Sequence, residues 1–496
     1  MKELVQAQLN RKPLAYRLGE SVRVLANGGS PVLLLHFPLK FVVLHPLWRP
    51  VLESIANRGL ITFERIRSLV GHGDPDGMLF FLNGLVRRGF LEQEGSPAPA
   101  PLPRVSIIIP VRNRPEDISA CLHSLAGLVY PVENLEIIVV DDASTDNTPR
   151  AISEFPVNLI SLKEHRQASH CRNLAARKAG GDILAFIDSD CLANALWLQD
   201  LVPAFTDPSV GAVGGIVGAY FKESALDRYE EVKSSLIVSR RARRSQDNDK
   251  AFYVPSCNLL VRRNLFLQLG GFREELFVGE DVDFCWRMQD AGHHLEFRPE
   301  GKVFHKHRNR LWPFCARRFD YGTSEPMLQR LHRKRGKEMV FPPATALFWL
   351  TAALSVILKT ALPLVLCFLL VSIDTLKKWN RVRRRGLPIR FPLLLSVVLR
   401  GYFAFFQNGC AFVSRYYLIW SIFLLPLWPP VSGVILGMHV LTGFVEYVIK
   451  KPRLNFFAFI FYFSLEQLSY QSGVWWGCVR NLSFHAVNPK LVCKTR

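Results

Sequence analysis

The chain has 496 residues and a formal net charge of +20 at pH 7. This length exceeds one ordinary hydrophobic core and predicts two or three domains. The positive excess favours an anionic partner, which could be a nucleotide, a nucleic acid or a lipid surface. The ten cysteines form no CxxC pair, which argues against a zinc site or a disulfide framework and favours a reducing compartment.

The N-terminal region, residues 1–95, is a small mixed segment that lacks the apolar core of a secretory signal. Its last part, GMLFFLNGLVRRGFLEQE, predicts a helix that ends at Gly89 and leads into a short strand. This pattern is typical of a small winged-helix unit, for which DNA binding is one possible role. The Pro-rich stretch GSPAPAPLP follows and predicts a stiff linker over residues 96–103.

The middle region, residues 104–340, alternates short apolar runs with helical patterns. This alternation predicts a parallel sheet that is covered by helices on both faces. The expected strands are VSIIIPV at 105–111, LEIIVVDD at 135–142, VNLISL at 157–162 and DILAFIDSD at 182–190, and the expected helices are PEDISACLHSLAGL, TDNTPRAISEF and ASHCRNLAARKA.

Polar side chains follow three of these runs, and the carboxyl ends of parallel strands meet at one edge of a sheet, where ligands bind. The residues are Arg112 and Asn113, then Asp141 and Asp142, then Asp188 and Asp190. The spacing of the last pair indicates a divalent cation. The alternative for Asp190 is a cap on a helix that begins near Ala193, and for Asp141 and Asp142 it is a turn before a helix that begins at Ser144 or Thr145.

The last region, residues 341–496, is strongly apolar and is broken by basic clusters. The stretch from Ala344 to Ile373 is long enough to cross a bilayer once, but Lys359 and Pro363 interrupt it. Basic residues flank it on both sides, which the positive-inside rule places in the cytosol. A re-entrant hairpin that turns near Lys359 to Pro363 reconciles these features, whereas the alternative is a set of buried soluble helices.

The motifs IIIPVRNRPEDISACLHSL, VVDDASTDNT, ASHCRNLAARKAGGDILAFIDSD and GEDVDFCWRMQDAG resemble, in order and spacing, those of family-two glycosyltransferases. The resemblance covers roughly residues 104–325. It implies a Rossmann-like GT-A fold, a UDP-sugar donor and a divalent metal, Mg²⁺ or Mn²⁺. It also implies a single displacement that inverts the anomeric centre.

The resemblance assigns roles to individual residues. Asp281 is the expected general base on the acceptor hydroxyl, and Glu280 orients the acceptor. Arg172 is expected to meet a phosphate, although a solvated helix charge is the alternative. The expected nucleotide-binding residues are Pro110, Arg112, Asn113, Asp141, Asp142, Arg172 and Asp188, and the expected metal ligands are Asp188, Asp190 and His305, with His307 competing for the place of His305.

Four other positions in the matched segment carry weaker expectations. Asp283 is expected to stabilise the start of a helix through its charge. Asn258 is expected near the sugar or acceptor, and RRFDYG, with Arg317 and Arg318, is expected to close over the diphosphate. Inversion requires no second nucleophile, so Cys257 receives no role.

The N-terminal region resembles peptide-recognition domains of the PqqD type. Its combination with a family-two domain resembles the glycosyltransferases that modify mycofactocin, a peptide-derived redox cofactor. The resemblance implies transfer of a hexose, expected to be glucose, to a peptide-derived acceptor, by an enzyme at the cytoplasmic membrane with its catalytic domain facing the cytoplasm. No nucleic-acid partner is expected. The alternatives are a transferase acting on a polyprenyl phosphate or polysaccharide, and a binding protein with an inactive transferase fold.

Overall fold

The structure is a computed structural model and describes residues 14–19, 21–27, 30–35, 40–71, 75–94, 102–239, 242–245, 251–384 and 389–492. The chain divides into two compact units. The first contains residues 1–98, 339–409 and 491–496, and the second contains residues 99–338 and 410–490. The segment 341–496, expected as one membrane region, is therefore divided between the two units.

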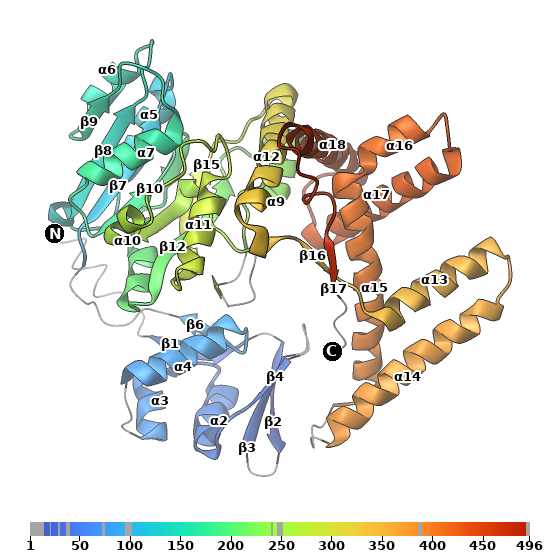
Figure 1. Ribbon diagram of the computed structural model, residues 1–496. Helices are drawn as coiled ribbons and strands as arrows, with labels where there is room; N and C mark the ends of the chain where they lie inside the picture. The colour runs from blue at the N-terminus through green and yellow to red at the C-terminus, as the bar shows by residue number, and fades with distance from the viewer. Residues whose placement is uncertain are drawn as a thin grey trace. The chain divides into compact units, whose positions relative to one another are not determined.

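The second unit is built on a sheet whose first four strands match the predicted apolar runs (Figure 1). They are β7 (Val105–Val111), β8 (Leu135–Asp141), β9 (Asn158–Ser161) and β10 (Ile183–Phe186). Each neighbouring pair in the order β9-β8-β7-β10 is parallel, as predicted. Every residue of β7 and β10 is buried, whereas β9 lies at the edge and is mostly exposed.

Beyond β10 the sheet is mixed, so the expectation of a wholly parallel sheet is wrong there. The order continues through β14 (Leu259–Arg262), β12 (Val210–Ala219), β15 (His294–His305) and β11 (Cys191–Ala193). β14 runs antiparallel to both β10 and β12, and β11 runs antiparallel to β15. The regular strand–helix alternation, which makes neighbouring strands parallel, ends after β10.

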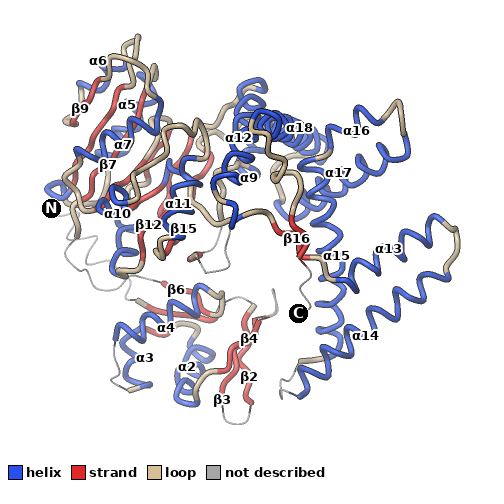
Figure 2. Tube along the Cα trace, viewed as in Figure 1, coloured by secondary structure: helices blue, strands red, loops and turns tan. Residues whose placement is uncertain are grey.

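Helices cover both faces of this sheet (Figure 2). On one face, α5 (Pro115–Ala126) buries Ile118, Cys121, Leu122 and Leu125. On the other, α7 (Gln167–Lys178) and α11 (Glu280–Asp290) pack small and aromatic side chains against the strands. The shorter elements of this domain are α6 (Thr148–Ser153), α8 (Trp197–Leu201), α9 (Ala225–Lys233), α10 (Arg263–Gln268) and β13 (Arg243–Arg244).

Two long helices of the second unit, α12 (Leu311–Leu331) and α18 (Phe456–Arg480), cross in close contact. A Cβ on Gly322 would lie 2.1 Å from the Tyr470 carbonyl oxygen, and a Cβ on Gly473 would lie 2.0 Å from that of Phe319. Only glycine therefore fits at this crossing. This crossing packs α18 against the segment that leads to the cavity. The other C-terminal helices of the second unit are α16 (Leu418–Leu424) and α17 (Pro429–Lys450).

In the N-terminal part of the first unit, the described residues form two three-stranded sheets and the helices α2, α3 and α4. The predicted helix is α4 (Pro75–Arg87), and Gly89 adopts a φ of 81° before β6 (Leu91–Glu94), as expected. Most of the predicted linker, residues 95–101, lies outside the described residues. The remaining elements are β1 (Ala15–Leu18), β2 (Val22–Asn27), β3 (Ser30–Leu35), β4 (Lys40–Val43), β5 (Ile61–Thr62), α2 (Arg49–Arg58) and α3 (Phe63–Val70).

The first unit also contains the predicted apolar hairpin. The helices α13 (Pro343–Ile357) and α14 (Leu362–Arg384) are joined at Lys359, which has a φ of 52°. The Thr351 hydroxyl and the Cys367 thiol lie 3.0 Å apart between them, which confirms the predicted break and reversal of the chain.

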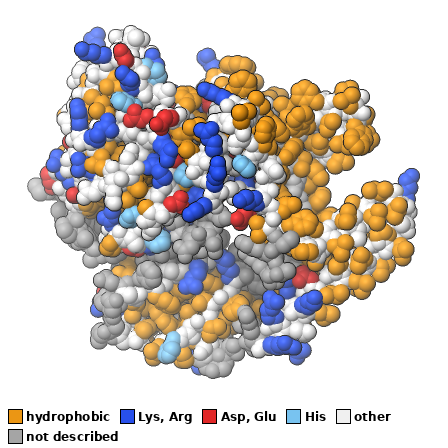
Figure 3. Space-filling model, in the orientation of Figure 1, with side chains coloured by type: hydrophobic (Ala, Val, Ile, Leu, Met, Phe, Trp, Pro, Cys, Tyr) orange, Lys and Arg blue, Asp and Glu red, His pale blue; other side chains and the backbone are white. Residues whose placement is uncertain are grey.

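Exposed apolar side chains cover α13 and the first half of α14 (Figure 3). Within the part of the chain that the structure describes, two other helices are long and apolar enough to cross a membrane, α15 (Phe391–Tyr416) and α17. Length and composition alone make this weak evidence for a transmembrane protein.

Candidate active site

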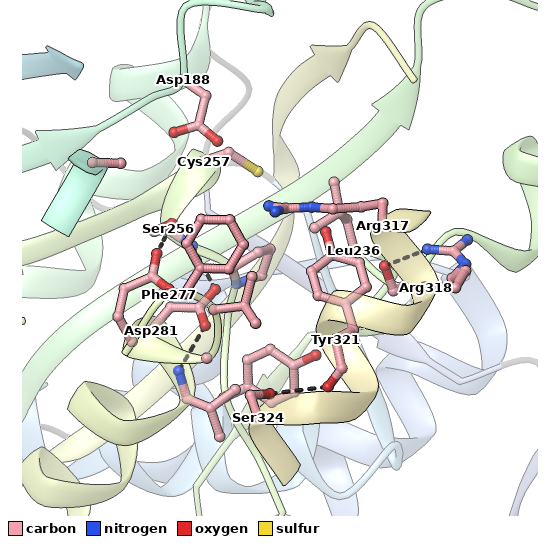
Figure 4. A pocket seen from close by; sticks show the side chains of 18 of the residues that line it. Asp188, Leu236, Ser256, Cys257, Phe277, Asp281, Arg317, Arg318, Tyr321 and Ser324 are labelled. Carbon is pink, nitrogen blue, oxygen red and sulfur yellow. Dashed lines mark hydrogen bonds between the residues drawn. The ribbon is translucent and has the colours of Figure 1, made fainter. Parts of the chain in front are cut away.

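A cavity of about 680 Å³ opens in the second unit at the carboxyl ends of β7 and β10. The loop before α11 and the helix α12 form further walls (Figure 4). Glu466 and Tyr470 of α18 also line the cavity. Of the predicted site residues, Pro110, Arg112, Asp142, Arg172, Asp188, Asp190, Glu280, Asp281 and His305 line it. Asn113 and Asp141 do not belong to this lining.

At one end of the cavity, Asp190 meets His305. The strand β11 begins directly after Asp190, and Cys191 pairs with His305 in the antiparallel register of β11 and β15. This register brings the His305 Nε2 atom within 3.5 Å of an Asp190 carboxylate oxygen. The alternative reading of Asp190 as a helix cap is wrong, because a strand follows it and the next helix begins at Trp197.

The donor set at this end fits a hard divalent cation. Asp190, Cys191 and His305 each offer one ligand atom, and these atoms lie within 4.8 Å of one another. Burial raises the pKa of the Cys191 thiol far above its ordinary value, so the thiol stays protonated and leaves an oxygen and a nitrogen donor. Burial opposes the charge on Asp190, but His305 and Arg114 outweigh it and hold the pKa of that carboxyl low.

His307, the competing histidine, also lines the cavity, and its Nδ1 atom lies 3.2 Å from that of His305. Its side chain is buried, and its Nδ1 atom lies 3.8 Å from a Glu230 oxygen. Burial, together with the neighbouring His305 and Arg318, lowers its pKa to about 3. The geometry therefore favours His305 as the residue beside Asp190.

Arg172 is buried and bridges two acids of the cavity. Its guanidinium donates to Asp188 at 2.5 Å and to Glu280 at 3.0 Å. Burial opposes the charge, but Asp188 and Glu280 outweigh it and raise the pKa of the guanidinium. The reading of Arg172 as a solvated helix charge is wrong. Asp188 is held by this ion pair and lies outside the Asp190–His305 group.

Asp281 stands in the first turn of α11, which begins after Gly279 with a φ of 85°. The backbone N–H groups of Ser256 and Val282 donate to its two carboxylate oxygens at 3.1 and 2.8 Å. Burial and the adjacent Glu280 charge raise the pKa of Asp281 to about 7. A carboxylate with this pKa suits a proton acceptor that works near neutral pH.

The pH dependence of transfer follows from this raised pKa. Only the deprotonated Asp281 accepts a proton, so transfer is expected to rise with pH and to reach half of its maximum near pH 7. Two units below that pKa, at pH 5, the rate is expected to fall roughly a hundredfold. Initial rates at saturating donor would measure the profile, and a flat profile between these two values of pH would exclude Asp281 as the titrating base.

Asp142 caps a helix at the edge of the cavity. Its carboxylate accepts from the backbone N–H groups of Arg166 and Gln167, at 2.7 and 2.9 Å, and so caps the start of α7. The helix expected at Ser144 or Thr145 begins instead at Thr148.

Asp141 and Asn113 shape the neighbouring loop. Asp141 accepts from the Ser144 N–H at 3.2 Å. The Asn113 side chain accepts from the Thr145 N–H at 2.8 Å. These two residues therefore support the loop that follows β8 behind the cavity wall.

The structure corrects the expectation for Asn258 and extends the one for Asp283. Asn258 is fully buried, donates to the carbonyl groups of Ile216 and Gly301, and accepts from Trp197, so it holds strands together away from the cavity. Asp283 is also fully buried and makes ion pairs with Arg273, Arg287 and His332. It lies in the first turn of α11, as expected, and its ion pair with His332 also ties this helix to the end of α12.

The structure adds one residue to the predicted site and reassigns another. The Arg114 guanidinium donates to the Asp190 carboxylate at 2.6 Å. Its position two residues after Arg112, in the same predicted loop, is the sequence feature that indicates a place in the site. Arg318 is buried in an ion pair with Glu230, so its charge is already balanced inside the protein. Arg317 lies on the same helix and lines the cavity beside Tyr321.

Comparison with known proteins agrees with this arrangement. Residues 106–270 match the family described as Glycosyl transferase family 2. They are a family 2 glycosyltransferase domain. This domain contains β7, β10 and the Asp188 and Asp190 pair, and its mixed α/β sheet has the GT-A fold.

Relatives extend the similarity beyond the domain. The pre-mycofactocin glycosyltransferase of Mycobacterium tuberculosis is 28% identical over 402 residues, which cover 78% of this chain and 82% of that protein. The glycosyltransferase AglE of Haloferax volcanii is 32% identical over 203 residues, which cover 40% and 64% of the two chains. A solved mannosyltransferase from Pyrobaculum calidifontis, in complex with GDP-Man and Mn²⁺, is 19% identical, with a TM-score of 0.45 over 78% of this chain and 89% of that chain.

Proposed function

We propose that this enzyme moves a hexose, with glucose as the leading candidate, from a UDP-sugar to a hydroxyl group of a peptide-derived acceptor, a precursor of mycofactocin. The main support is one cavity that carries the Asp190–His305 pair at one end and the raised-pKa carboxyl of Asp281 elsewhere along its wall. The name of the Mycobacterium tuberculosis relative supports the acceptor class.

In the proposed reaction, Asp281 accepts the proton of the acceptor hydroxyl while that oxygen attacks the anomeric carbon. The bond from the anomeric carbon to the UDP oxygen breaks in the same step, so the configuration inverts. Glu280 orients the acceptor, and Arg172 holds Glu280 in place. Cys257 takes no part: a hydrogen bond with Cys191 lowers the pKa of its thiol, but burial outweighs this and raises it.

The donor would lie against the residues at the carboxyl ends of the strands. Pro110, Arg112 and Asp142 would line the nucleotide pocket, with Asn113 and Asp141 supporting its loop. Asp190 and His305, with Asp188 nearby, would hold Mg²⁺ or Mn²⁺. A bound cation supplies positive charge that neutralises the diphosphate.

We assign the enzyme to the cytoplasmic membrane, with its catalytic domain facing the cytoplasm. The α13 arm of the hairpin is too short to cross, because its 15 residues are about 22 Å long and the hydrocarbon core is about 30 Å thick. The last turn of α14 carries Arg381, Arg383 and Arg384, which suit a cytoplasmic membrane face.

The N-terminal region, residues 1–95, is proposed as a PqqD-like unit that recognises the acceptor. Deleting it would expose apolar surface, because Val32 and Leu34 pack on Ile389 and Leu394 within the first unit. A test on the full chain is therefore preferable.

Hydrogen exchange provides this test. A premycofactocin-like peptide acceptor is expected to slow amide exchange within residues 14–94, because ligand contacts protect the backbone. The same measurement with duplex DNA serves as the control and is expected to leave exchange unchanged. Protection confined to the catalytic cavity, or protection by DNA with a steep salt dependence, would contradict acceptor recognition by this region.

A second candidate acceptor is a polyprenyl phosphate or a growing polysaccharide. Arg415, in the last turn of the candidate membrane helix α15, lines the same cavity as Asp281, which favours an acceptor that approaches from a lipid surface. Transfer to a polyprenyl phosphate in the absence of any peptide acceptor would favour this candidate.

Donor hydrolysis distinguishes an active glycosyltransferase from a binding protein with an inactive transferase fold. Purified protein with UDP-glucose and Mn²⁺ is expected to release UDP slowly without acceptor and faster with it. A binding protein with an inactive transferase fold would bind the nucleotide and leave the donor intact under both conditions.

A further inference from the structure

Phe277 exposes a large apolar side chain at the wall of the catalytic cavity. Its side chain is 63% exposed, whereas the two neighbouring residues, Leu276 and Val278, are 3% and 4% exposed. Leu276 packs with Trp286 and Leu328 in a small apolar cluster. The buried neighbours therefore hold Phe277 outward.

The segment that carries Phe277 is also held upstream. Glu274 accepts from Asn173 at 2.9 Å and lies 2.8 Å from His170, and both partners belong to α7. Downstream, the chain enters α11 at Glu280, directly before Asp281. The segment that carries Phe277 is thus held on both sides, four residues before the proposed base.

Other apolar side chains line the cavity with Phe277. Tyr321 comes from α12 and Leu236 from the segment after α9, and Figure 4 shows the rings of Phe277 and Tyr321 projecting into the cavity. The Arg317 guanidinium lies 4.8 Å from the centre of the Tyr321 ring, which orients that ring. This part of the cavity differs from the donor end, where charged side chains such as Arg114 and Asp190 dominate.

We propose that Phe277, Tyr321 and Leu236 form an acceptor subsite that binds an uncharged, flat apolar ring and so presents a hydroxyl group of the same molecule to Asp281. The subsite rests on the proposed function. Aromatic side chains bind rings by stacking and by removing apolar surface from water, and an exposed phenylalanine gains both contributions only when a ligand covers it.

Two glycosides that share their sugar hydroxyls test this preference. Phenyl β-glucoside carries an aromatic ring where methyl β-glucoside carries a methyl group. The full-length protein, loaded with UDP and Mn²⁺, is expected to bind the phenyl glycoside about tenfold more tightly in calorimetry. Equal affinities would overturn the subsite. Because calorimetry needs no turnover, this outcome is independent of whether the protein transfers a sugar.

Substitutions locate the subsite. Phe277→Ala is expected to abolish the tenfold preference, and Phe277→Tyr is expected to keep it, because tyrosine retains the ring. Trp312→Ala is the matched control, since Trp312 is 82% exposed and lies outside the cavity lining. A preference that survives in Phe277→Ala, or that disappears in Trp312→Ala, would overturn the assignment.

Kinetics provide a second readout if transfer is observed. Phe277→Ala is expected to raise the acceptor KM about tenfold and to leave the donor KM and acceptor-independent UDP release unchanged. An equal rise in both KM values would place Phe277 outside an acceptor subsite.

Discussion

Replacing Asp281 by asparagine is expected to reduce transfer by about a hundredfold to ten-thousandfold while leaving UDP binding intact. The amide is nearly the same size as the carboxylate but does not accept the proton of the acceptor hydroxyl. The two carboxylate oxygens accept from the backbone N–H groups of Ser256 and Val282, and asparagine keeps an acceptor for one of them, so intact UDP binding serves as the check that the site stays folded.

The measurement is transfer under saturating donor, together with calorimetry of UDP binding. Asp290→Asn is the matched control, because Asp290 lies at the other end of α11, is 58% exposed and does not itself line the cavity. Normal turnover in Asp281→Asn would assign the base to another group.

Replacing Asp190 by alanine is expected to remove nearly all transfer, by more than about a hundredfold, and to weaken Mn²⁺ binding. Asp190 is the only carboxylate in the group that it forms with Cys191 and His305 among the described residues. The substitution also leaves the guanidinium of Arg114 without its closest carboxylate at the donor end.

Mn²⁺ binding, measured by paramagnetic resonance, separates loss of the cation from loss of the fold. Asp182→Ala is the control. Asp182 is exposed and directly precedes β10, whereas Asp190 lies beyond the other end of that strand. Excess chelator is expected to reproduce the Asp190→Ala result in the wild-type protein. Full transfer in chelator would contradict a role for a divalent cation.

Local patterns predicted the first half of the sheet well. β7 and β10 are covered on both faces, so their residues form continuous apolar runs that are visible in the sequence. The break in the C-terminal apolar stretch was predictable for a similar reason, because Lys359 and Pro363 interrupt it.

Long-range pairing was not predictable from residue patterns. The contact between Asp190 and His305 depends on the register of β11 and β15, which are more than a hundred residues apart in the chain. The same limit explains why Asn258 was wrongly predicted to lie near the sugar or acceptor. Its hydrogen-bond partners, Trp197, Ile216 and Gly301, belong to three separate segments of the chain.

The sequence of α18 contains a local pattern that indicates its close crossing with α12. Gly473 and Gly477 are spaced as in GxxxG, a pattern typical of closely packed helices. A Cβ at Gly477 would lie 2.7 Å from the Thr323 carbonyl oxygen, so both glycines face α12. The pattern predicts the contact but does not identify its partner helix.

The central claim, inverting transfer to a peptide-derived hydroxyl group, is tested most directly by identifying the product. The full-length protein would be incubated with UDP-glucose, Mn²⁺ and a premycofactocin-like acceptor, and the product would be analysed by mass and by the anomeric coupling constant. We expect one added hexose whose anomeric configuration is inverted relative to the donor. A product with retained configuration, or donor consumption without any glycosylated acceptor, would contradict it.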